Sequence, residues 1–184
     1  MTTTTASRTT PATWTVDPAH TDVAFSVRHM GLSTVRGRFE QVAGTVETGV
    51  DGAPTAVRIE IETASINTGT KDRDAHLRSG DFFDAEAHPS ITFVSTRVTD
   101  RGGERFEVEG DLTMHGVTKP VVLDAEIGEA ITDPWGLPRR AATASAKLNR
   151  KEWGLTWNQI LEAGALLVAE EVKLSIDVQV TRQG

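Results

Sequence analysis

The sequence VKLSIDVQV at residues 172–180 alternates strictly between apolar and polar side chains. Successive side chains of an extended strand point to opposite faces, so this segment has one apolar face and one polar face. Strands buried on both sides of a parallel sheet are apolar throughout, whereas antiparallel strands commonly keep one solvated face. The segment therefore predicts an antiparallel strand that packs on a core with one face only.

The same two-residue period recurs along most of the chain. It is clear at 23–28, 57–62, 106–112, 121–127 and 142–148, and less regular at 35–48 and 91–99. Turn-forming residues separate these segments at 51–54, 100–103 and 133–136. The chain also holds 25 Thr, 18 Val and 8 Ile, which pack well in strands. We expect an all-β fold with about eight long strands and a short first strand near residues 14–17.

Each predicted strand has one apolar face, which leaves two architectures. Two sheets could pack face to face, or one sheet could close into a barrel with its apolar faces inside. Residues 71–79 indicate a helix with Thr70 as its N-cap and Gly80 at its exit, and 156–161 is a weaker helix candidate. Residues 1–13 carry seven threonines and predict a disordered tail, so a single domain is expected over 14–182.

Composition and motifs exclude several classes of protein. A net charge of −7 without a basic cluster argues against nucleic-acid binding, and the absence of cysteine removes disulfides and thiolate sites. The longest apolar run, 163–169, is too short to cross a membrane, and no secretory signal precedes the first strand, so a cytoplasmic location is expected. No nucleophile elbow or phosphate-binding loop is present, and we predict no catalytic residues and no enzymatic activity.

Five short motifs follow one another along the chain. They are WTVDPAHTDVAFSVRH at 14–29, VRGRF at 35–39, DAHLRSGDFFD at 74–84, HPSITFVST at 88–96 and GDLTMHGVTKPV at 110–121. In this order they resemble the YceI family of lipid-binding proteins. The resemblance implies an extended, lipocalin-like barrel of eight antiparallel strands with one or two short helices at one end. It also implies a lumen that takes up a polyisoprenoid, an isoprenoid quinone or a fatty-acid derivative, and often a homodimer.

The residues themselves bear on whether such a lumen is hollow. Ala142, Ala144 and Ala146 place three methyl groups on one apolar face, Gly110 adds no side chain, and the chain has only six Phe. Little bulk is then left to fill a tall barrel, and empty apolar volume is costly unless a ligand occupies it. Alternatively, these small residues mark places where strands or a helix approach closely, and the interior is solid.

The apolar faces and the aromatic segments supply the candidate ligand-binding residues. The pair Phe82-Phe83 and the segment 153–161 suit a plug or lid beside a pocket mouth, or else the end-caps of an ordinary core. The complete candidate set is Phe25, Val27, His29, Phe39, Ile59, Ile61, Phe82, Phe83, Phe93, Leu112, Met114, Ala142, Ala144, Ala146, Trp153, Trp157, Ile160, Val172, Leu174 and Ile176.

Five histidines offer a second hypothesis, a small metal or haem protein or enzyme with its site inside the barrel. They are His20, His29, His76, His88 and His115, and they show neither an HExxH motif nor a pair one helical turn apart. We therefore assign no metal ligands. His29 continues an apolar face, where it could donate a hydrogen bond to a ligand head group.

The leading hypothesis is a carrier, store or scavenger of a long apolar lipid. Its expected partners are that lipid, transiently a membrane surface, and a second copy of the chain. We expect no cofactor apart from a bound polyisoprenoid or quinone-type lipid.

Overall fold

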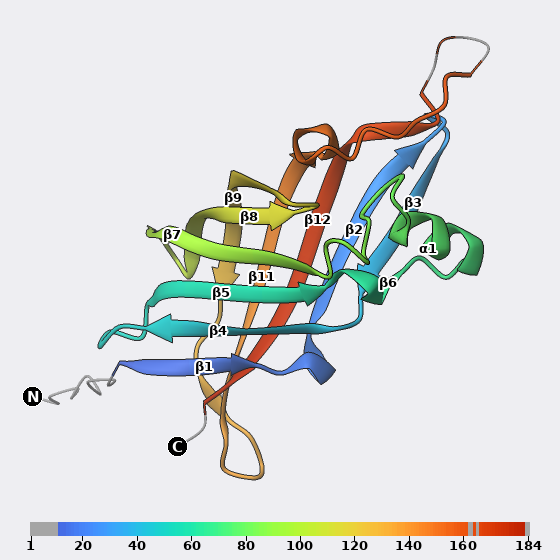
Figure 1. Ribbon diagram of the computed structural model, residues 1–184. Coiled ribbons are helices and arrows are strands. Elements are labelled where there is room, and N and C mark those ends of the chain that lie inside the picture. Colours follow the sequence, from blue (N-terminus) through green and yellow to red (C-terminus); the bar gives the residue numbers. More distant parts are fainter. Residues whose placement is uncertain (1–10, 162–163, 165, 183–184) are drawn as a thin grey trace, which may run out of the picture.

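A computed structural model describes residues 11–161, 164 and 166–182, and it is built almost entirely from strands (Figure 1). The strands are β1 (Ala12–Val16), β2 (Asp22–His29), β3 (Ser33–Phe39), β4 (Val42–Thr48), β5 (Pro54–Glu62), β6 (Ile66–Asn67), β7 (Ser90–Gly102), β8 (Arg105–Met114), β9 (Val117–Ile127), β10 (Ile131–Thr132), β11 (Pro138–Asn149) and β12 (Val168–Thr181). One α-helix, α1 (Lys71–Arg78), lies in this part of the chain, with 3₁₀ turns at Pro18–His20, Thr63–Ser65 and Arg150–Trp153.

The strands form one antiparallel sheet that closes into a barrel. Eight of them follow one another around the ring in the order β11-β9-β8-β7-β5-β4-β1-β12, and β12 pairs again with β11. The long strand β12 makes this closure: it pairs with β11 from Thr181↔Arg139 to Glu171↔Asn149. Its other edge pairs with β1 near Val180 and with β2 from Asp177 to Val168. The predicted eight-stranded antiparallel barrel is confirmed.

The two ends of the barrel are built differently (Figure 1). At one end, which we call the helix end, β2 and β3 extend the wall, and the segment 63–89 with α1 lies beside them. At the other end, the hairpin end, β10 and β11 form a hairpin through Asp133–Gly136.

The aspartates at the start of the three predicted turns accept backbone N–H groups two residues on: Asp51 from Ala53, Asp100 from Gly102 and Asp133 from Trp135. This is the turn chemistry that the sequence predicts.

The interior faces of the strands hold the core. It includes Trp14, Phe39, Ile66, Phe93, Val108, Leu148 and Trp153. In the clearest segment, Val172, Leu174, Ile176 and Val178 are only half-buried, although all four face inward and the last three pack against the core. Incomplete burial of inward apolar residues indicates that protein side chains do not fill the interior.

Several local predictions are wrong. The segment 35–48 is two strands, because Glu40 and Gln41 break it between β3 and β4. Residues 156–161 form no helix and run as an irregular segment up to an isolated bridge between Ile160 and Leu166. The predicted helix at 71–79 is present as α1, but the side chain of Thr70 makes no capping hydrogen bond.

The barrel begins two residues earlier than predicted. Ala12 and Thr13 belong to β1 and pair with Thr48 and Glu47, because these residues continue the ladder beside β4. Residues 1–10, the rest of the predicted tail, lie outside the described residues. Within the described residues, no helix is long and apolar enough to cross a membrane.

Candidate functional site

The barrel encloses an apolar cavity at its helix end. Its volume is about 180 Å³, whereas about 10–15 Å³ by the same kind of measure holds one water. Apart from Arg150, every residue of its wall is apolar. The wall consists of Val23, Phe25, Val27, Phe39, Val42, Ile59, Ile61, Leu77, Phe82, Phe83, Ile91, Phe93, Leu112, Met114, Val121, Leu123, Leu148, Arg150, Leu155, Val168, Val172, Leu174, Ile176 and Val178.

A second cavity of about 100 Å³ continues the first toward the hairpin end. The two adjoin because Ile59, Phe93, Leu123, Ile176 and Val178 line both of them. Its wall also includes Trp14, Val46, Thr48, Pro54, Val57, Val108, Ala125, Ile127, Arg140, Ala141, Ala142, Thr143, Ala144 and Val180. We call the two together the lumen. Along β12 it extends from Val168 to Val180, about 40 Å of strand at ~3.3 Å per residue.

Alanine provides the space at the hairpin end. Ala144 lies between Ala125 on β9 and Ile176 on β12, and Ala142 lies between Ile127 and Val178. These positions are paired in a regular ladder, so the strands are held at ordinary spacing. The volume that a larger side chain would occupy is left open, as expected for a hollow barrel.

Glycine, in contrast to alanine, allows close packing at Gly110 and Gly37 and does not leave open volume. A Cβ at Gly110 would lie 2.5 Å from the Phe93 ring and 2.6 Å from the carbonyl oxygen of Val94. A Cβ at Gly37 would meet the ring of Phe25, its cross-strand partner, at 2.5 Å. At Gly110, therefore, the interpretation as added lumen volume is wrong and the alternative of close approach is right. Each glycine lets an aromatic ring approach the backbone of the barrel wall closely.

Two arginines, the buried Arg150 and the half-buried Arg140, lie at opposite ends of the lumen wall. The Arg150 guanidinium donates to the carbonyls of Leu155, Val168 and Ala169, and so pins the segment that follows β11 to the start of β12. At the hairpin end, Arg140 donates to the carbonyls of Gly128 and Gly52 and lies 5.9 Å from the centre of the Trp14 ring. Burial lowers the pKa of both guanidiniums, which still remain charged at neutral pH.

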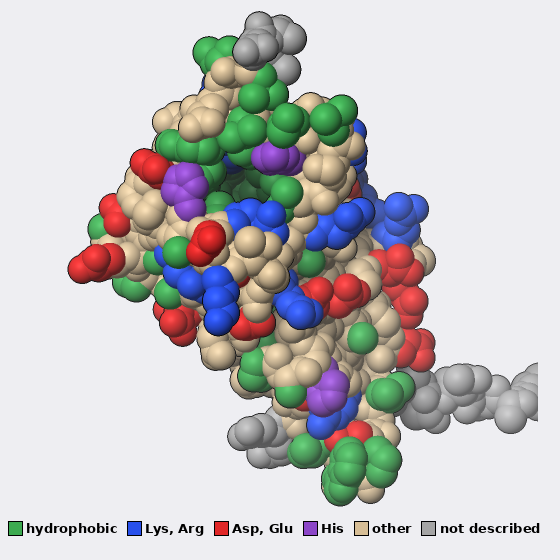
Figure 2. All heavy atoms as spheres, turned by 90° about the vertical axis from the view of Figure 1, so that its right-hand side faces the viewer, with side chains coloured by type: hydrophobic (Ala, Val, Ile, Leu, Met, Phe, Trp, Pro, Cys, Tyr) green, Lys and Arg blue, Asp and Glu red, His purple; other side chains and the backbone are tan. Residues whose placement is uncertain are grey.

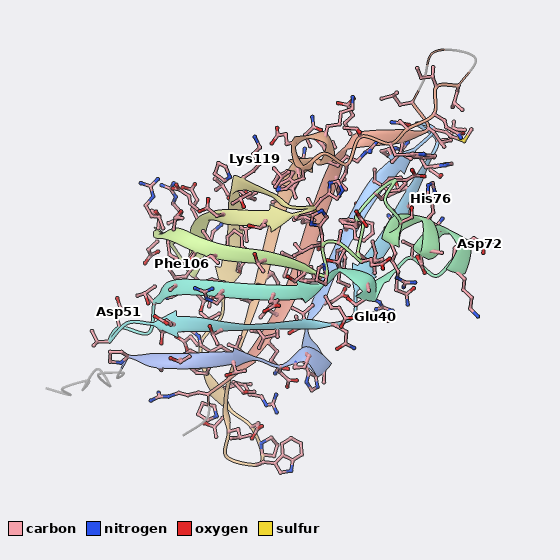
Figure 3. All side chains as sticks on the ribbon, viewed as in Figure 1. Glu40, Asp51, Asp72, His76, Phe106 and Lys119 are labelled. Carbon is pink, nitrogen blue, oxygen red and sulfur yellow. The ribbon has the colours of Figure 1, made fainter. Side chains whose placement is uncertain are left out.

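Aromatic side chains close the helix end. Phe83 packs edge-on against Phe39 with ring centres 5.9 Å apart, and Phe82 lies 5.2 Å from Trp157. The ring centre of His76 on α1 (labelled in Figure 3) lies 4.7 Å from that of Trp157. His76 Nε2 donates a hydrogen bond to the Asp81 carboxylate at 2.8 Å. Phe82 and Phe83 thus line the cavity beside this closure.

A seam runs between the two segments that make this closure, 63–89 and 150–168. Among their described residues, no hydrogen bond or ion pair joins one segment to the other, and the contacts across the seam are aromatic. Figure 2 shows a hollow with a hydrophobic floor in the upper part of the face that carries α1, flanked by two histidine side chains. The seam and the hollow thus lie together at the helix end.

Most of the predicted ligand-binding residues line the lumen. They are Phe25, Val27, Phe39, Ile59, Ile61, Phe82, Phe83, Phe93, Leu112, Met114, Ala142, Ala144, Val172, Leu174 and Ile176. Of the others, Ala146 packs against the core without reaching either cavity, and Trp157 lies behind Phe82 in the closure.

The remaining three predicted residues lie farther from the lumen. Trp153 is fully buried and donates its indole N–H to the carbonyl of Leu112, so it is an end-cap of the core. Ile160 is 77% exposed. His29 pairs with Ser33 and Val168 at the end of β2 and does not line either cavity, so the expected position beside a head group inside the lumen is not observed.

The described residues do not form the kind of site that the metal or haem hypothesis requires. None of the five histidines lines the lumen, and no group of three or more potential ligands comes together there. His88 and His115 are neighbours, with ring centres 5.1 Å apart, but His115 Nδ1 is engaged with the carbonyl of Trp153.

Sequence reasoning missed several wall residues. Val23, Leu123 and Val178 lie on the same alternating faces as predicted residues and could have been included on that signal. Leu77 of α1 and Leu155 of the irregular segment carry no such signal, because neither belongs to a strand.

Comparison with known proteins agrees with this architecture. The family model described as a YceI-like domain matches residues 14–180. A UPF0312 protein of Vibrio cholerae is 39% identical over 138 residues, which cover 74% of this chain and 73% of that protein. A UPF0312 protein of Photorhabdus laumondii is 39% identical over 135 residues, 73% of this chain and 70% of that protein.

Solved structures share the fold. The YCEI protein of Campylobacter jejuni superposes with a TM-score of 0.74 at 26% identity, over 85% of this chain and 90% of that one. Burkholderia cenocepacia BcnA gives a TM-score of 0.77 at 20% identity, covering 89% and 98%. A polyisoprenoid-binding domain from Saccharophagus degradans gives 0.70 at 14% identity, covering 92% and 98%. By the match over residues 14–180, the chain belongs to the YceI-like domain family.

Proposed function

We propose that the lumen binds the hydrocarbon chain of a long lipid and that the protein is a carrier, store or scavenger of that lipid. The observation that carries this proposal is the pair of adjoining cavities, whose walls are apolar over almost their whole length. The arginines of the wall donate to backbone carbonyls, and no histidine faces the interior. Such a space favours methylene and methyl groups and offers no catalytic group, so we infer binding rather than catalysis.

The energy available from the lumen is sufficient for this role. Each CH₂ group transferred from water into an apolar site contributes on the order of 0.8 kcal/mol. A chain with about a dozen such groups would gain roughly 10 kcal/mol before the cost of ordering chain and protein is subtracted. Affinity should therefore rise with chain length until the chain reaches the hairpin end.

The chemistry of the chain is proposed more specifically as isoprenoid. The similar domain of Saccharophagus degradans is described as polyisoprenoid-binding. A polyprenol or an isoprenoid quinone would place its tail in the lumen and its polar head at the helix end.

Lipid analysis and a pair of neighbouring variants test the proposal. Organic extraction and mass spectrometry of the purified protein, before and after incubation with a polyprenol and a menaquinone, should reveal one bound chain. Ala144→Trp fills the hairpin-end cavity from the inward face and should weaken binding of long chains at least tenfold. The control is Ser145→Trp, one residue along β11 on the exposed face, which should bind like the wild type. No chain bound under any condition, or equal binding by the two variants, would contradict the proposal.

Homodimerisation stays a prediction of the family resemblance. Light scattering of the purified protein at several concentrations tests it, and a monomer throughout would contradict it.

A further inference from the structure

Exposed apolar side chains gather on two loops at the helix end. We call Met30, Leu32, Ile160 and Leu166 the apolar tip. Leu32 is 79% exposed and Ile160 is 77% exposed, the highest values among large aliphatic residues of the described chain. The two loops are joined, because the amide of Met30 donates to the carbonyl of Leu167 at 2.8 Å and the amide of Leu167 donates to Gln159 at 2.9 Å. The tip is therefore one surface made by two hydrogen-bonded loops.

The turn that carries Leu32 is held in place. Met30 and Gly31 both adopt positive φ values, 53° and 69°, which make a tight turn between β2 and β3. The guanidinium of Arg28 donates to the carbonyl of Gly31 and to the hydroxyl of Thr34 across that turn. A rigid turn that holds a leucine out in water gains nothing for folding, since exposed apolar surface is unfavourable. Its exposure calls for an apolar partner.

A band of cations lies directly below the tip. We call Arg28, Arg36, Arg38 and Lys173 the basic belt; all four are exposed on the outer face of β12, β2 and β3. The strand register places Lys173 and Arg36 on either side of Ser26, and Arg38 opposite Ala24. On the neighbouring face, which carries α1, hydrophobic side chains gather at the top and Lys and Arg side chains lie below the hollow (Figure 2).

Acidic groups on the same strands lie at the far end or beside other cations. Asp22 and Asp177 face each other at the opposite end of the β2–β12 pair, and Glu170 and Glu171 lie beside Lys151 and Lys147. Among the described residues, no ion pair joins a belt cation to a carboxylate, on a protein whose net charge is −7. A local positive field beside an apolar tip fits a surface that is anionic outside and apolar inside.

We propose that the apolar tip and the basic belt dock the protein on an anionic lipid bilayer. This proposal rests on the lipid-binding function proposed above and names the surface through which the lipid is exchanged. The tip enters the acyl region, the belt contacts lipid phosphates, and the mouth of the lumen faces the bilayer. The strands that carry tip and belt, β2 and β12, also line the lumen through Val27, Val168 and Val172, so the path from bilayer to cavity is short.

Vesicle co-sedimentation of the full chain tests the proposal. The wild type should bind vesicles of phosphatidylcholine mixed with phosphatidylglycerol and bind pure phosphatidylcholine vesicles more weakly. Arg36→Gln and Arg38→Gln should each weaken binding to the anionic vesicles about fivefold, since a cation near such a surface contributes about 1 kcal/mol. Leu32→Ser with Ile160→Ser should weaken binding to both kinds of vesicle.

Matched controls lie on other faces of the barrel. Val122→Ser removes an exposed apolar side chain of β9 and Lys119→Gln removes an exposed cation of the same strand. Both should bind vesicles like the wild type. Failure of the wild type to bind either vesicle would overturn the proposal and leave the belt to an acidic protein partner. Tip or belt variants that bind no differently from these controls would also overturn it.

A second measurement separates this proposal from the lumen itself. Leu32, Ile160, Arg36 and Arg38 do not line the cavities, so their variants should take up a polyprenol presented in cyclodextrin as the wild type does. They should take it up more slowly from anionic vesicles. If the wild type did not take up the polyprenol from cyclodextrin, that result would instead contradict the lipid-binding function.

Discussion

The hairpin end and the helix end of the lumen are closed by different kinds of interaction. At the hairpin end, Trp14 donates its indole N–H to Thr48 at 3.2 Å, and Arg139 forms ion pairs with Asp17 and Asp133, each at 2.7 Å. At the helix end, the segments 63–89 and 150–168 are each anchored to the barrel but touch one another through aromatic rings. Directional polar contacts resist opening more than a seam of ring contacts does, so the ligand should enter at the helix end.

The largest effect is expected from the anchor of the helix end. Arg150→Met removes the charged donor that holds the carbonyls of Leu155 and Ala169, while Val168 keeps a bond from Asn158. One buried and one part-buried acceptor then lose their partner, and the free energy of unfolding should fall by about 3–4 kcal/mol. Urea denaturation measures it.

The neighbouring residue provides the control for that variant. Lys151→Met removes an exposed ion pair with Glu170, and its effect should stay below about 1 kcal/mol. Equal stability losses for the two variants would mean that the guanidinium of Arg150 is not the anchor.

The junction between the two cavities gives a smaller effect. Gly110→Ala brings a Cβ against the Val94 carbonyl and the Phe93 ring. Because the backbone carbonyl cannot move aside as a side chain can, the free energy of unfolding should fall by about 1–3 kcal/mol. Gly37→Ala meets only the side chains of Phe25 and Thr68. It should therefore lose less stability and instead push the Phe25 ring into the helix-end cavity, weakening ligand binding.

Denaturation and ligand titration of both glycine variants separate these outcomes. If Gly37→Ala lost as much stability as Gly110→Ala and bound ligand normally, the difference between side-chain and backbone contacts would not hold.

Opening the seam gives a kinetic effect. Trp157→Ala removes the ring that touches both Phe82 and His76, and such aromatic contacts are worth about 0.5–1.5 kcal/mol. Ligand dissociation should accelerate by about two- to tenfold, measured by stopped-flow transfer to an acceptor. Trp135→Ala, an 82% exposed tryptophan of the hairpin-end loop, is the control and should leave the rate unchanged. Faster dissociation from the control variant would place the entrance at the hairpin end.

The smallest effect concerns pH. Arg139 and then His20 lower the pKa of Asp17, and Arg139 lowers the pKa of Asp133. Carboxylates with a lowered pKa stabilise the fold above their unfolded pKa of about 3.9, and this stabilisation is lost as pH falls through the lower folded value. The Tm of the wild type should decrease when the pH falls below about 4. Arg139→Met should make this decrease smaller, because it raises the pKa values of Asp17 and Asp133 toward normal. An unchanged acid profile in that variant would show that this cluster does not hold the hairpin end.

The alternation in the sequence predicted which faces of the strands line the lumen, although Val23, Leu123 and Val178 on those faces were not included. The period of two at Val172, Leu174 and Ile176 assigns each residue to a face, and closure of the sheet then assigns that face to the interior. The period carries no information on irregular segments, and so Leu155 and the anchoring role of Arg150 were not predicted.

The helix predicted at 156–161 shows a different limit. Its apolar residues have helix-like spacing but serve separate contacts: Trp157 packs on Phe82, whereas Ile160 is exposed on the apolar tip. Gly110 was ambiguous for a further reason. Whether a small residue leaves space or admits a neighbouring ring depends on Phe93, whose side-chain direction is a property of the folded barrel.

A crystal structure of the protein with a long-chain ligand brominated at its tail end is the most direct test of the hollow barrel. The account predicts an anomalous bromine peak in the hairpin-end cavity between Ala144 and Ile176, with density for the chain continuing past Phe93 to the helix end. A peak only on the outer surface of the barrel, with no chain in the lumen, would contradict it.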